Sequence, residues 1–84
     1  MASKPCIICV DNGDRWEDYD WHVVGIAKSP SAAIDYCCDV LGWQYKNCLS
    51  DRVTFYAGLN SFGKTKHGWV EEVDWIDNLH PNIS

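Results

Sequence analysis

The chain has 84 residues, a formal net charge of −5 and 46% apolar residues, including five Trp, four Tyr and two Phe. This aromatic content is too high for a disordered tail, and the length suits one small domain over residues 1–84. Direct binding to nucleic acid is not expected, because generic nucleic-acid binders gain affinity by neutralising phosphates with basic residues.

The first predicted strand spans residues 5–10, an apolar run that leads into Asn12-Gly13. Asn-Gly is the strongest signal for a two-residue hairpin, but such a turn would place carboxylates opposite the most apolar part of the strand. We therefore expect a longer loop over residues 11–19 and a second strand over residues 20–27. Alternation predicts Trp21, Val23, Gly25 and Ala27 on one face of this strand, and His22, Val24 and Ile26 on the other.

A helix is expected next, because Ser29 suits the N-cap, Pro30 the first helical position and Gly42 the left-handed position that ends a helix. Trp43 is placed to fold back over the last turn. A helix of this length is marginal alone, so it must dock on a sheet. The spacing i, i+3, i+4 and i+7 predicts one apolar stripe formed by Ile34, Cys37, Cys38 and Leu41.

A third strand is expected over residues 52–59, a turn over residues 60–63 and a returning strand over residues 64–73. The following residues, 73–79, suit a short helix, although an extended strand also fits part of them. The predicted order is ββαββ. This is an α+β fold, in which a small antiparallel sheet of about four strands carries one amphipathic helix on one face.

The segment Gly58–Thr65 matches the phosphate-loop pattern G-x-x-x-x-G-K-[ST]. The helix that should follow the motif is interrupted by Gly68, and too few residues remain for the further parallel strands of a nucleotide-hydrolysing fold. A nucleotide or small-ligand domain is therefore an alternative, and no cofactor is expected. The residues that would hold its ligand are Gly58, Gly63, Lys64 and Thr65. The basic trio around this turn is Arg52, Lys64 and Lys66.

Neither metal binding nor catalysis is expected. Cys6 and Cys9 form a C-x₂-C pair that could bind zinc with Cys48 or His22, but in a strand the two sulfurs would point to opposite faces. No cysteine or histidine lies in a recognisable nucleophile setting. An odd number of cysteines and no signal peptide predict a cytoplasmic location, and no apolar run is long enough to cross a membrane.

Nine of the twelve carboxylates lie in two stretches that also hold large aromatics, residues 11–21 and residues 69–77. A loop that keeps Trp among five acids would lower solubility unless a partner uses it. Charge would steer the encounter with a basic partner, and aromatic area would supply adhesion. The predicted partner-binding residues are Asp14, Trp16, Glu17, Asp18, Tyr19, Asp20, Glu71, Glu72, Asp74 and Trp75.

The sequence therefore predicts a non-enzymatic, stoichiometric regulator or inhibitor, acting as a monomer or homodimer. Its partner would be a basic, nucleic-acid-binding protein, whose phosphate sites the carboxylates partly mimic. By analogy of size and charge, the chain resembles small acidic proteins with which phages and mobile elements block host enzymes, such as anti-CRISPR and anti-restriction proteins. It would then act in the host cytoplasm. An antitoxin or immunity protein is a further alternative, which differs only in its partner.

Overall fold

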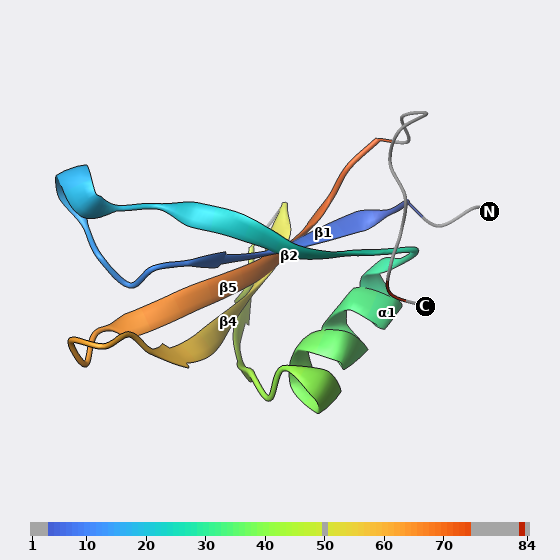
Figure 1. The fold of residues 1–84 in the computed structure, drawn as a ribbon. Helices are drawn as coiled ribbons and strands as arrows, with labels where there is room; N and C mark the ends of the chain where they lie inside the picture. Colours follow the sequence, from blue (N-terminus) through green and yellow to red (C-terminus); the bar gives the residue numbers. More distant parts are fainter. Residues whose placement is uncertain (1–3, 50, 75–82, 84) are drawn as a thin grey trace.

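The computed structural model describes residues 4–49, 51–74 and 83. Within them, one antiparallel sheet has the strand order β2-β1-β5-β4-β3. Helix α1 (Pro30–Asp35) continues into a π-helical turn, η2 (Tyr36–Val40), and α1 packs on one face of the sheet (Figure 1). The five strands are β1 (Cys6–Asp11), β2 (Trp21–Ala27), β3 (Gln44–Cys48), β4 (Arg52–Leu59) and β5 (Thr65–Glu72).

The α+β class is confirmed, but the predicted order ββαββ lacks one strand, since the observed order is ββαβββ. The missed strand is β3, which pairs antiparallel with β4 at the edge of the sheet. All of its residues are exposed, and its sequence Gln-Tyr-Lys-Asn-Cys has no apolar alternation that would signal a buried face. The other four strands agree with the prediction within one residue. The predictions for residues 75–79 lie outside the described residues.

A β-bulge in β2 overturns the predicted division of its faces. Successive β1 residues pair with Gly25 and then with Val23, so Val24 has no partner in the register. An extra residue flips every side chain beyond it to the other face. Gly25 and Ala27 are therefore buried on the side of α1, whereas Val23 and Trp21 are about half exposed on the opposite face.

The helical segment formed by α1 and η2 begins and ends with the predicted signals. The Ser29 side-chain oxygen accepts a hydrogen bond from the Ala32 N–H at 3.3 Å. Pro30 occupies the first helical position, where no backbone N–H is needed. After η2, Gly42 adopts a φ of +70°, the left-handed conformation that costs glycine little. Among the described helical segments, none has the length and hydropathy needed to cross a bilayer.

The buried stripe of the helix differs from the prediction. Ala33 and Cys37 are fully buried, whereas Cys38 is exposed. The Leu41 N–H donates to the Tyr36 carbonyl at 3.0 Å, a bond across five residues that widens the last turn. Because a wider turn changes the angular position of each residue, Cys38 leaves the stripe that a regular 3.6-residue period predicts.

The core lies between α1 and the helix-facing side of the sheet. Trp43 packs against it from the chain that follows the helix, with its ring centroid 6.0 Å from that of Phe55. Ile83 joins the core because its N–H donates to the Ile26 carbonyl at 3.1 Å, beside β2. The buried core residues are Cys6, Ile8, Ala27, Ala33, Cys37, Phe55, Val70 and Ile83.

Gly68 is required by the position of the Trp43 ring. A Cβ at Gly68 would lie 2.3 Å from a ring atom of Trp43, which forces the indole to move. We expect Gly68→Ala to lower the free energy of unfolding by about 1–3 kcal/mol, measured by urea denaturation. In a Trp43→Ala background the same substitution should cost less than half as much. Equal costs in both backgrounds would show that the clash is not the cause.

The thiols should separate into two classes. Burial is the main cause that raises the pKa of Cys37 to about 12 and that of Cys9 to about 11, and burial also raises the pKa of Cys6. Because the thiolate is the reactive form, only the exposed Cys38 and Cys48 should react quickly in the folded chain at pH 8. A disulfide reagent should therefore titrate two thiols before unfolding and five after. A third fast thiol in the folded state would contradict this assignment.

Candidate functional site

The β1–β2 loop (residues 12–20) and the β4–β5 loop (residues 60–64) meet at the end of the sheet that projects beyond α1 (Figure 1). They meet because β1 and β5 are antiparallel neighbours, so that Val10 near the end of β1 pairs with Gly68 near the start of β5. We call the surface formed by residues 12–20 and 60–64 the loop end.

Asn12 organises the first of these loops. Its side-chain oxygen accepts hydrogen bonds from the N–H groups of Asp14 and Asp20, at 3.0 and 3.3 Å. Its side-chain nitrogen donates to the Asp18 carbonyl at 2.7 Å, and its backbone N–H donates to the Asp20 carbonyl at 3.0 Å. One asparagine therefore ties the start of the loop to its far end, as asparagine side chains commonly do in turns.

Asn60 organises the second loop and joins it to the first. Its side-chain oxygen accepts hydrogen bonds from the N–H groups of Phe62 and Lys64, at 2.8 and 2.9 Å. Its side-chain nitrogen donates to the Asn12 carbonyl at 3.0 Å. Gly13 permits this approach, because its φ is +78° and a Cβ there would lie 2.8 Å from the Asn60 side chain.

The segment Gly58–Thr65 does not form a phosphate loop. The N–H groups of Phe62 and Lys64 already bind Asn60, whereas a phosphate loop presents such groups to its ligand. The residues that follow form β5 instead of the required helix. The predicted basic trio is also divided, because Arg52 lies at the far end of β4, where it forms an ion pair with Glu71 at 3.2 Å.

Trp16 is the most exposed large apolar side chain of the described residues, at 92%. It begins a single 3-10 turn, η1 (Trp16–Asp18), which is closed by a hydrogen bond from the Tyr19 N–H to the Trp16 carbonyl at 3.2 Å. Its φ is +62°, and no other described non-glycine residue has a positive φ. This conformation costs a bulky residue about 1–3 kcal/mol, so the surrounding loop must hold it.

The first acidic stretch gathers at the loop end around Trp16. Glu17, Asp18 and Asp20 are exposed, and Asp14 is half-buried with one oxygen 3.5 Å from the side-chain nitrogen of Asn60. The adjoining loop adds Phe62, which is 79% exposed. The loop end therefore combines negative charge with three large aromatic side chains, those of Trp16, Tyr19 and Phe62.

The second acidic stretch lies at the opposite end of the sheet. Glu72 pairs with Cys6 at the start of β1, and Glu71 is bound by Arg52. Asp74 lies 3.8 Å from Lys4. The predicted partner-binding residues thus form two separate groups and not one surface. Trp75 lies outside the described residues.

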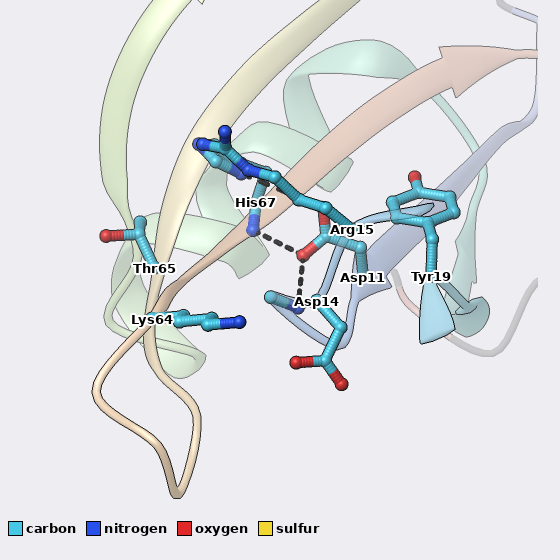
Figure 2. A pocket seen from close by; sticks show the side chains of 8 residues that line it. Asp11, Asp14, Arg15, Tyr19, Lys64, Thr65 and His67 are labelled. Atoms are coloured by element: carbon cyan, nitrogen blue, oxygen red, sulfur yellow. Dashed lines mark hydrogen bonds and ion pairs between the residues drawn. The ribbon is translucent and has the colours of Figure 1, made fainter. Parts of the chain in front are cut away.

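A cavity of about 560 Å³ opens between the two loops and the start of β5 (Figure 2). In Figure 2, Lys64 enters from the β4–β5 loop, while Tyr19 stands on the other side, with Asp11 between them. Sequence spacing does not group these residues, because they come from three segments that only the sheet register brings together. The side chains that line the cavity are Asp11, Asp14, Arg15, Tyr19, Lys64, Thr65 and His67.

Asp11 is only 8% exposed, yet its carboxylate is well satisfied. One oxygen accepts hydrogen bonds from the N–H groups of Gly13 and His67, at 3.0 and 2.8 Å, and the other lies 3.7 Å from His67 Nδ1. These contacts fix His67 beside the cavity. Burial raises the pKa of Tyr19 and the charge of Asp11 raises it further, with Arg52 opposing, so the phenol remains a hydrogen-bond donor at neutral pH.

The sheet face that α1 does not cover carries a second set of aromatic and basic contacts. The ring centroids of Trp21 and Trp69 are 5.8 Å apart, and the Arg52 guanidinium lies 5.4 Å from the Trp69 ring centroid. Lys46 lies over the ring of Tyr56 at 5.6 Å. Trp21 and Arg52 cover Trp69, which is only 9% exposed on an otherwise open face.

Comparison with protein-family models, with curated proteins and with solved structures gives no match to this chain. The functional interpretation therefore depends on the loop end and on the cavity beside it. Within residues 4–49, 51–74 and 83, no group of three or more His, Cys, Asp or Glu side chains is arranged to hold a metal ion.

The two roles of Asn60 can be separated by substitution. Asn60→Ala removes both the oxygen that binds the Phe62 and Lys64 N–H groups and the nitrogen that binds the Asn12 carbonyl. We expect it to lower the free energy of unfolding by about 1–3 kcal/mol in urea denaturation. Asn60→Asp keeps an oxygen that can accept from the Phe62 and Lys64 N–H groups but removes the donor to Asn12. It should lower the free energy of unfolding by an intermediate amount. Ser61→Ala, in the same loop, is the control. A neutral effect of Asn60→Ala would contradict the described loop network.

Proposed function

We propose that this chain is a protein-binding regulator or inhibitor whose loop end docks onto a basic partner protein. The observation that carries the proposal is Trp16, an indole that is 92% exposed in a strained backbone conformation within a hydrogen-bonded loop. Neither the exposure nor the strain stabilises the fold. Tryptophan is enriched among the anchors of protein interfaces, and a rigid loop loses little entropy on binding.

The charges around Trp16 indicate the chemistry of the partner. Arg15 is the only base among residues 11–21, where five carboxylates lie. Such a field attracts a Lys- or Arg-rich surface and increases the rate of encounter. A groove that binds phosphates would also accept these carboxylates. We therefore propose a nucleic-acid-binding protein as the partner, which the chain would block by occupying its nucleic-acid site.

A host defence enzyme that binds DNA or RNA is one such partner, and the chain would then be an anti-defence protein of a phage or mobile element. Its unpaired cysteines suit action in the cytoplasm. An antitoxin or immunity protein would use the same loop end against a toxic enzyme, so the identity of the partner separates these alternatives. Glu71 and Asp74 are not part of the proposed interface, because Arg52 and Lys4 already pair with them.

Substituting Trp16 tests the anchor separately from the fold. Asparagine tolerates the left-handed conformation better than tryptophan does, so Trp16→Asn should raise the free energy of unfolding by about 1 kcal/mol. Val40→Asn is the matched control, since Val40 is 65% exposed on η2. Immobilised wild-type and Val40→Asn chains should both retain the same basic protein from a lysate of the native host, while Trp16→Asn should retain at least tenfold less. Equal retention by all three chains would contradict the proposal.

A second pair of variants tests the charge. Glu17→Gln combined with Asp18→Asn removes two exposed charges of the loop end, and Asp35→Asn combined with Asp39→Asn removes two exposed charges of the helical segment. We expect affinity for the retained partner to fall steeply as salt is raised from 50 to 500 mM. The Glu17/Asp18 variant should bind more weakly at low salt, and its affinity should depend less on salt. The Asp35/Asp39 variant should change neither the affinity at low salt nor its salt dependence. An affinity that does not vary with salt would contradict phosphate mimicry.

A further inference from the structure

Two cations line the cavity at the loop end, and neither has a carboxylate partner among the residues that the structure describes. Neither Arg15 nor Lys64 forms an ion pair within the described segments, whereas Lys4 and Arg52 both do. They come from different loops, and both line the same cavity. Cations that line a cavity and have no ion-pair partner among the described residues can hold an anionic ligand there.

The two carboxylates that border the cavity, Asp11 and Asp14, are held by other groups. Asp11 accepts hydrogen bonds from Gly13 and His67, and its second oxygen lies near the imidazole of His67. Asp14 is half-buried, with one oxygen directed toward Asn60 at 3.5 Å. Each carboxylate therefore has a partner of its own in the loop network, and neither forms an ion pair with the two free cations.

The walls of the cavity also offer aromatic area. Tyr19 is 46% exposed and lines one side, with its hydroxyl protonated at neutral pH. His67 lines another side, and its ring is tilted by 47° to the Tyr56 ring at a centroid distance of 6.1 Å. Flat rings of this kind stack against nucleobases of any sequence, with a gain of about 1–3 kcal/mol per base. A volume of about 560 Å³ lies within the range of small-molecule sites and can contain a base, a ribose and one phosphate.

The cavity is held in shape before any ligand arrives. Asn12 and Asn60 fix the two loops that form its rim, and Asp11 fixes the backbone of His67 at its base. Preformed sites bind more tightly because little ordering is needed on binding. An anionic group in this cavity would be bound by the side chains of Arg15 and Lys64, and not by the backbone N–H groups that a phosphate loop uses.

We propose that this cavity binds a nucleoside monophosphate, with the phosphate between Arg15 and Lys64 and the base against Tyr19. The site is distinct from the Trp16 anchor, and the inference does not depend on the protein-binding function. It differs from the phosphate-loop interpretation because the ligand lies beside the β4–β5 loop, in the cavity shared with the β1–β2 loop.

Titration of the ¹⁵N-labelled 84-residue chain with AMP, UMP, adenosine, uridine and inorganic phosphate tests the proposal. A nucleotide should shift the amide signals of residues 13–15 and 64–67 and should saturate. It should bind at least tenfold more tightly than its nucleoside or inorganic phosphate. Phosphate binding as tightly as either nucleotide would reduce the cavity to a simple anion site and overturn the proposal, as would shifts confined to other residues.

Variants assign the roles within the site. Arg15→Ala and Lys64→Ala should each weaken nucleotide binding at least fivefold, and Lys64→Arg should restore it to within twofold. Tyr19→Leu should abolish the preference for nucleotide over inorganic phosphate while phosphate still binds. Lys28→Ala is the control, because Lys28 is exposed outside the cavity. Amide spectra confirm that each variant is folded. Unchanged affinity in folded Lys64→Ala would overturn the proposal.

Discussion

The hydrogen bonds of two asparagines, Asn12 and Asn60, hold together the end of the sheet on which both proposed activities depend. A nine-residue connection between β1 and β2 would ordinarily sample many conformations, because it has little sheet to pack against. Asn12 closes this loop on itself, and Asn60 attaches it to its neighbour. The strained Trp16 can persist only in a loop that is fixed in this way.

The fold also separates charges that the sequence places in two similar stretches. The antiparallel register puts residues 11–20 at one end of the sheet and residues 71–74 at the other. At the second end Glu71 pairs with Arg52 and Asp74 with Lys4. At the loop end Glu17, Asp18 and Asp20 remain exposed, and two cations line a cavity. One pair of loops therefore forms two features, an exposed surface around an aromatic side chain and a small polar cavity. The net charge of the chain predicts neither feature.

Local chemistry made part of this structure predictable. The cap at Ser29, the turn at Gly42, the long first loop and four of the strands follow from residue type and spacing. Three features do not follow in this way: two depend on pairing between strands, and the third on a local widening of the helix. The edge strand β3 lacks an apolar pattern, the bulge at Val24 reverses the faces of β2, and the widened turn η2 exposes Cys38. The exposure of Trp16 followed from its acidic context, but the cavity did not, because only the register of β1 with β5 brings its residues together.

Both proposals require the loop end to be rigid before it meets a ligand or partner. Backbone ¹⁵N relaxation of the free chain measures this rigidity. We expect order parameters of about 0.8 or higher for residues 12–20 and 60–64, close to those of the strands, including the amide of Trp16. Values below about 0.6 through these loops, with the strands ordered, would mean that Asn12 and Asn60 do not hold them. Neither a fixed indole anchor nor a preformed cavity would then exist.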